Sequence, residues 1–215
     1  MSKIRTINDL QDKLDYEYSW RIKEIANVKS ITKKSSIIKQ PTAIRAGIPL
    51  LYAHWEGFIK KSSTHYLEYI NSQSLSYSDL KSCFVVFGIK RRLNDLIESK
   101  KASITVEALD FIRNEMSQKA KLKIASAIRT ESNLSSTVFE NIAKSIGINT
   151  SKYLTRAKLI DESLLNRRNK IAHGEFMDLE FDGFKNLADD IILLIRWYKT
   201  DIENAASLQQ YKKTA

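Results

Sequence analysis

Apolar residues recur at intervals of three and four along most of the chain, the spacing that places them on one face of an α-helix. The first such stripe predicts a helix over residues 7–28, and the polar, basic residues 29–39 predict a connection after it. A second stripe predicts a helix from Pro41 to about Asn71, which Pro49 should kink or divide because proline removes a helical hydrogen bond. The two stripes consist of Ile7, Leu10, Leu14, Tyr18, Ile22 and Ile25, then Leu51, Trp55, Phe58, Tyr66 and Tyr69 or Ile70.

The middle of the chain has weaker patterns. They favour one helix over residues 80–98 and another over 105–116, although residues 104–106 fit a short strand equally well. The basic segment 119–129 indicates no single element.

Capping residues mark two further helices. Thr137 and Glu140 have the spacing of a capping box, so they predict a short helix that ends at Gly147. Asp161 is a good N-cap, which predicts a helix from this residue to His173, where the following glycine should end it.

The sequence predicts one helical domain. A last apolar stripe predicts a long helix over residues 179–205. Glycine and proline, on which tight turns depend, number only six and two, so composition favours long helices over a β-sandwich or barrel. We therefore expect an all-α bundle forming a single domain over residues 1–215, with a core at about 41–205, the helix 7–28 packed on it, and a flexible tail at 207–215.

The net charge and the cysteine content of the chain limit the kinds of function that the sequence allows. The net charge of +10 attracts polyanions, which leaves nucleic acid, a membrane surface, an acidic protein or simply a solubilising lysine-rich surface open. Cys83 is the only cysteine, which excludes an internal disulfide and, with three histidines, the common Cys/His zinc patterns. No targeting segment and no apolar run long enough for a bilayer are visible, so we expect a cytoplasmic protein without membrane association, metal or cofactor.

The strongest chemical signal is Arg-Asn-Lys-Ile-Ala-His-Gly at residues 168–174. On local pattern alone, cations in a last helical turn before glycine are an ordinary helix C-terminus. The same residues also suit phosphate chemistry, because histidine transfers protons near neutral pH and the planar arginine side chain matches phosphate oxygens.

This segment resembles the motif of the HEPN superfamily, the "higher eukaryote and prokaryote nucleotide-binding" helical domains. The motif of that superfamily is an arginine, usually followed by a polar residue, and then a histidine four to six positions after the arginine. The likeness covers roughly residues 44–197. Its parts are Arg168, Asn169 and His173, the segment 50–60 (Leu-Leu-Tyr-Ala-His-Trp-Glu-Gly-Phe-Ile-Lys), and residues 132–136 with 146–148.

The resemblance implies an HEPN-type helical bundle with additional helices, a homodimer, and metal-independent RNA cleavage in a cleft that two subunits share. Arg168, His173 and Asn169 are then the catalytic residues, and a 2′,3′-cyclic phosphate and a 5′-hydroxyl are the expected product ends. Many such proteins are toxins or anti-phage effectors, which implies an antitoxin or a neighbouring defence protein as a partner.

Helix geometry also favours a second subunit. At about 100° per residue, Arg168 and His173 lie roughly 140° apart on an ideal helix, whereas Asn169 and His173 share a face. A kink, the helix end or a second subunit must bring the two charged groups together. A two-fold interface would supply two histidines and two arginines, and so one acid and one base, in an order that the sequence leaves open.

Other residues have supporting or weaker roles. Glu56 can hold His173 or Arg168, but it also fits a surface carboxylate or the partner of a structural arginine. Arg167 has motif spacing as well, and we interpret it as an RNA backbone contact. Weaker candidates for RNA contact, against the alternative of a solvated basic face, are Lys170, Lys60, Lys61, Arg91 and Arg92.

Two other functions stay open at this stage. One is a non-catalytic HEPN module that binds RNA or a partner protein, and the other is a helical partner of a nucleotidyltransferase. The nuclease is preferred because both the arginine and the histidine of the motif are present.

Overall fold

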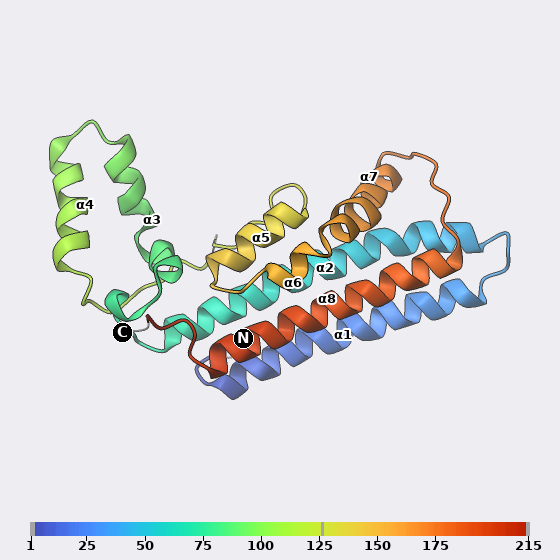
Figure 1. Ribbon diagram of the computed structural model, residues 1–215, viewed down its shortest axis with the longest axis horizontal. Helices are drawn as coiled ribbons and strands as arrows, with labels where there is room; N and C mark the ends of the chain where they lie inside the picture. The colour runs from blue at the N-terminus through green and yellow to red at the C-terminus, as the bar shows by residue number, and fades with distance from the viewer. Residues whose placement is uncertain (1–2, 126, 214–215) are drawn as a thin grey trace.

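Three long helices form the body of the protein in the computed structural model, which describes residues 3–125 and 127–213 (Figure 1). They are α1 (Ile7–Lys34), α2 (Gln40–Ser72) and α8 (Phe181–Ser207), and each packs against the other two. No strand occurs among the described residues, which confirms the predicted all-α fold. The remaining elements are η1 (Tyr77–Asp79), α3 (Ser82–Glu98), α4 (Ala102–Asn114), α5 (Ser136–Ser145), α6 (Ser151–Leu154), η2 (Leu159–Asn166) and α7 (Arg167–Ala172).

Two features of the long helices differ from the sequence-based prediction. Helix α1 continues through the expected connection as far as Lys34, and Thr32 within this extension is fully buried. Helix α2 is continuous across Pro49, so the proline does not divide it. Tertiary packing explains both differences, because a helix held by its neighbours tolerates polar residues and one missing hydrogen bond.

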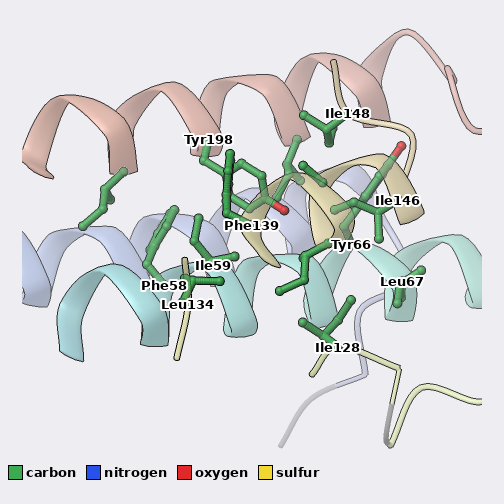
Figure 2. Packing of buried hydrophobic residues seen from close by; sticks show 14 of the residues in the cluster. Phe58, Ile59, Tyr66, Leu67, Ile128, Leu134, Phe139, Ile146, Ile148 and Tyr198 are labelled. Carbon is green, nitrogen blue, oxygen red and sulfur yellow. The ribbon is translucent and has the colours of Figure 1, made fainter. Parts of the chain in front are cut away.

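A second layer packs across the three-helix body. The elements α5, η2 and α7 contact α2, and η2 also contacts α8. Phe139 of α5 packs against Trp55 of α2 and Tyr198 of α8, and Figure 2 shows Phe139 and Tyr198 in the same core as Phe58 of α2. These aromatic side chains are fully or almost fully buried. Such a core fixes the second layer, including the helix that carries the motif, against α2.

Two predicted helix caps are wrong: Thr137 for α5, and Asp161 for the helix that carries the motif. Ser135, not Thr137, caps α5 and accepts a hydrogen bond from the Val138 N–H (3.2 Å). Asp161 lies inside η2, and its carboxylate accepts hydrogen bonds from the Ser136 N–H (2.7 Å) and hydroxyl (2.5 Å). The carboxylate therefore satisfies the N-terminus of a neighbouring helix instead of starting its own. Gly147 has a left-handed φ of +71° and ends α5 as expected.

Helices α3 and α4 form a hairpin that projects from one end of the body (Figure 1). Residues 104–106, for which a strand was the alternative, are helical. The ambiguous basic segment contains no helix or named strand among its described residues, and it includes Lys119, which pairs with Ser76 in an isolated bridge.

The C-terminal segment, for which the sequence predicts a flexible tail over residues 207–215, has one buried residue, Tyr211, while its other described residues are exposed and residues 214–215 lie outside the described part. The Tyr211 side chain is almost fully buried against Tyr69, and the Tyr211 carbonyl accepts a hydrogen bond from the Lys81 N–H (3.0 Å). The burial of one aromatic ring thus holds a polar segment in place. Among the described residues, no helix combines the length and apolar character that a membrane crossing requires.

Candidate functional site

The motif helix α7 continues directly from a π-helical segment, η2, without a break in helical backbone angles. Ile160 and Leu164 of η2 are fully buried and fix the segment to the core, whereas α7 has no buried residue. The wider i→i+5 turns of η2 change the direction in which the residues after Asn166 point, a distortion that is frequent at functional sites. The motif therefore lies on a firmly anchored but accessible helix end.

Arg168 faces helix α2. Its side chain is half-buried, and Cζ lies 4.3 Å from the centre of the Tyr52 ring, which is a cation–π contact. Its Nη1 also donates a hydrogen bond to Asn169 Oδ1 (2.7 Å). These two contacts hold the guanidinium in one orientation while leaving other N–H groups available for an anion.

Tyr52 lies beneath this guanidinium and joins a third part of the chain to the site. Its buried hydroxyl accepts a hydrogen bond from the Leu134 N–H (2.7 Å). Burial raises the pKa of Tyr52, and the nearby Glu56 carboxylate adds to this rise, while the Leu134 N–H and Arg168 oppose it. Tyr52 is therefore a neutral phenol at physiological pH, and it presents an uncharged aromatic face to Arg168.

His173 lies at the C-cap of α7 with an exposed side chain. Gly174 follows with φ +75°, and the turn closes through hydrogen bonds from the Gly174 N–H to Ile171 O (3.1 Å) and from the Glu175 N–H to Lys170 O (2.9 Å). Arg45 of α2 then binds the Glu175 carbonyl through Nη1 (2.8 Å). The turn after the histidine is thereby fastened to the body.

The two central motif residues have different surroundings within the described chain. Arg168 points to Tyr52, His173 is exposed at the helix end, and within residues 3–125 and 127–213 no hydrogen bond joins their side chains. The Asn169 side chain accepts a hydrogen bond from Arg168, and its backbone carbonyl accepts one from the His173 N–H (3.0 Å). The imidazole and the guanidinium therefore share no hydrogen bond in the described chain.

The structure places the supporting candidate residues in different surroundings. Glu56 is half-buried beside Tyr52, but among the described residues it forms no ion pair with Arg168 or His173. Arg167 is half-buried and Lys170 is exposed on α7. Lys60 and Lys61 are exposed farther along α2.

Arg91 and Arg92 lie on α3, in the projecting hairpin that is distant from α7 in Figure 1. The guanidinium of Arg92 stacks on the Phe111 ring (3.8 Å), and Arg91 Nε lies 3.9 Å from an Asp95 carboxylate oxygen. These contacts lie within the hairpin, so the structure does not bring the two arginines to the motif.

Sequence reasoning missed Tyr52 as part of this site and did not single out Asn133 next to Leu134, the partner of Tyr52. The signal for Tyr52 was its position one helical turn before Glu56, which places both on one face of α2. Asn133 precedes the residue that binds Tyr52, and its Oδ1 is buried without a hydrogen-bond partner in the part of the chain that the structure describes. A buried polar atom without a hydrogen-bond partner is uncommon, and four other side-chain atoms of the described chain share this property.

His54 has a structural role. It is buried on α2 next to Trp20, and its Nε2 lies 3.0 Å from a Glu24 carboxylate oxygen. Burial lowers the pKa of His54 despite the attraction of Glu24, so burial favours the neutral ring.

An all-helical domain with an arginine and a histidine at this helix end is characteristic of the HEPN superfamily. In the comparison with protein families, the RiboL-PSP-HEPN family matches residues 16–204, and the chain belongs to this family. The same comparisons found no matching curated protein and no matching solved structure. The predicted resemblance is thus confirmed, and HEPN domains are typically ribonucleases.

Proposed function

We propose that this protein is a metal-independent endoribonuclease that works as a homodimer, with two copies of the α7 helix end facing one RNA phosphodiester. The observation that carries the proposal is that Arg168 is fixed over Tyr52 while His173 is exposed at the end of the same short helix. Each chain presents both groups without uniting them, so a second copy is the simplest way to complete the site.

The proposed reaction uses the RNA's own 2′-hydroxyl as nucleophile. One histidine accepts the hydroxyl proton as the oxygen forms its bond to phosphorus, and the other gives a proton to the departing 5′-oxygen as its bond to phosphorus breaks. The arginines bind the phosphate oxygens, whose negative charge increases in the transition state. The products are a 2′,3′-cyclic phosphate and a 5′-hydroxyl.

Cleavage of RNA in EDTA tests this function. Purified protein should cut a labelled single-stranded RNA in the presence of EDTA, and the upstream product should resist 3′-end labelling until its cyclic phosphate is removed. Binding without cleavage would instead support a non-catalytic module, and cleavage that EDTA abolishes would contradict the proposed mechanism.

The surface around the motif supports a self-association interface. Phe176, three residues after His173, is 87% exposed, and Ile37 and Ile38 in the connection between α1 and α2 are 91% and 90% exposed. Figure 1 shows this connection at the same end of the body as the connection between α7 and α8. Exposed apolar side chains that gather at one end of a protein are typical of surfaces that a partner covers, whereas scattered ones such as Val106 are ordinary.

Phe176→Asp should therefore dissociate the proposed dimer and lower cleavage at concentrations where the wild type is dimeric, because a buried charge opposes association. Analytical ultracentrifugation gives the mass, and an RNA cleavage assay gives the activity. Val106→Asp, on the exposed face of the α3–α4 hairpin, is the matched control and should remain dimeric. A Phe176→Asp protein that keeps the wild-type mass and activity would place the interface elsewhere.

The biological setting that we propose is a toxin–antitoxin or anti-phage system, with an antitoxin or a neighbouring defence protein as partner. This part of the proposal rests on analogy with other HEPN proteins alone.

A further inference from the structure

A second feature with ligand-binding character lies along the C-terminal half of α2, away from the motif. It is a cavity of about 1030 Å³ between the N-terminal residues, α1, α2 and the segment after α4. Its wall carries basic residues from all of these parts of the chain: Lys3, Arg5, Lys13, Lys60, Lys61 and Lys119.

These six basic residues, which we call the basic cavity set, outnumber the carboxylates near them, which are Glu68 in the wall and Asp9, whose Oδ2 accepts the Arg5 N–H (3.0 Å). Glu68 is the one carboxylate of the wall, and its Oε2 lies 3.2 Å from Nδ1 of His65, another wall residue. Within residues 3–125 and 127–213, none of the six forms an ion pair, whereas Lys29, Lys152 and Lys199 elsewhere each bind a carboxylate. A concave surface with this charge concentrates anions from solution.

The residues of the cavity wall indicate whether the phosphate backbone or the bases of a nucleic acid would bind there. Among the described residues of the wall there is no Phe, Tyr or Trp on which a base could stack, and its one aromatic ring, His65, is paired with Glu68. The wall also carries the amide group of Asn71, whose Oδ1 accepts the Leu122 N–H and whose side-chain N–H groups have no hydrogen-bond partner in the described chain. Lysine ammonium groups and small polar side chains are typical contacts for phosphate oxygens. The cavity therefore favours a phosphate backbone over a base.

One segment of the chain contributes both to the cavity wall and to the surroundings of the motif. The segment that begins at Lys119 in the cavity wall carries further exposed cations and ends at Leu134, whose N–H binds Tyr52 beneath Arg168. Figure 2 shows Ile128 and Leu134 of this segment beside α2. Along α2 itself, Lys60 lies about 12 Å from Tyr52 at about 1.5 Å per residue. The exposed cations of the segment are Lys121, Lys123 and Arg129.

We infer that this cavity binds the phosphate backbone of single-stranded RNA outside the bond that is cut. The inference rests on the proposed function for the identity of the polymer. Contacts of this kind add affinity without sequence preference and position the strand for the motif.

Charge reversal in the cavity tests the inference by binding alone. In a His173→Ala background, which keeps the RNA intact, Lys60→Glu with Lys61→Glu should raise the Kd for a labelled single-stranded RNA at least about ten-fold at 0.1 M salt. The slope of the logarithm of the association constant against log salt should become less steep by about 1.4, since each of the two lost contacts to a single strand contributes about 0.7. Fluorescence anisotropy measures both quantities.

The matched control is Lys100→Glu with Lys101→Glu, an equal charge change at an exposed lysine pair between α3 and α4. A Kd equal to that of this control would overturn the inference. Loss of pyrophosphate binding with unchanged RNA binding would also overturn it, because the cavity would then be a small-anion site. Weakened RNA binding would uphold the inference even if the wild type cuts no RNA, so the two proposals fail separately.

Discussion

Replacing His173 with alanine should lower the rate of RNA cleavage by about 10²- to 10⁴-fold, which is the usual contribution of one proton-transfer residue. If two copies of His173 form one site, the variant removes both the acid and the base, so the loss should lie near the upper end. The measurement is the initial rate of cleavage of a labelled RNA at saturating protein. Because the side chain is exposed and makes no hydrogen bond within the described chain, the free energy of unfolding should change by less than about 0.5 kcal/mol.

Asn114→Ala gives the matched control for this variant, since Asn114 is a polar residue at the exposed end of another helix, α4. It should cleave RNA at the wild-type rate. If His173→Ala cleaved as fast as this control and with the same product ends, the proposed site would be wrong, whatever the fold.

The long helices were predictable because each buries one continuous apolar stripe, and such a stripe has the same period in the sequence as in the structure. Their ends were less predictable. Helix α1 extends to Lys34, and within this extension Thr32 is fully buried and Lys29 forms an ion pair with Asp189 of α8, contacts that local sequence cannot anticipate. The π-helical turns of η2 likewise depend on packing and leave no periodic signal of their own.

The caps show the same limit. A hydroxyl or carboxylate near a helix start satisfies any free N–H within reach, and spacing alone does not reveal which one. Asp161 is a residue type that commonly caps its own helix, yet its carboxylate binds Ser136 at the start of α5. The sequence correctly indicated that the Asp161 carboxylate satisfies free N–H groups at a helix N-terminus, but it assigned the carboxylate to the wrong helix.

The motif was predictable as a short pattern, but the environment of its arginine was not. Arg168 is oriented by Tyr52, and Tyr52 is in turn held by Leu134, so three distant segments define one guanidinium position. Only packing of the second layer on α2 brings these segments together. The effect of this arrangement on catalysis can be measured.

Arg168→Ala should lower cleavage by about 10²- to 10³-fold, the usual cost of removing one charged or hydrogen-bonding group from a transition state. Arg168→Lys should recover only part of the loss, because an ammonium group lacks the planar fork that binds two phosphate oxygens. Arg113→Ala, which removes an exposed arginine from the last turn of α4, is the matched control and should leave the rate unchanged. If Arg168→Ala kept the wild-type rate, Arg167 would be the motif arginine.

Tyr52→Leu should reduce cleavage about 2- to 30-fold when Arg168 is present, the range that corresponds to a cation–π contact of about 0.5–2 kcal/mol. It should have no further effect in the Arg168→Ala background, because the ring acts by holding the guanidinium. Tyr52→Phe separates this role from stability: it keeps the ring but leaves the Leu134 N–H without its partner, which should lower the free energy of unfolding by about 1–3 kcal/mol. A double-mutant cycle of cleavage rates, with melting curves for each variant, measures the coupling. Independent, multiplicative effects of Tyr52→Leu and Arg168→Ala would show that the ring does not act through the arginine.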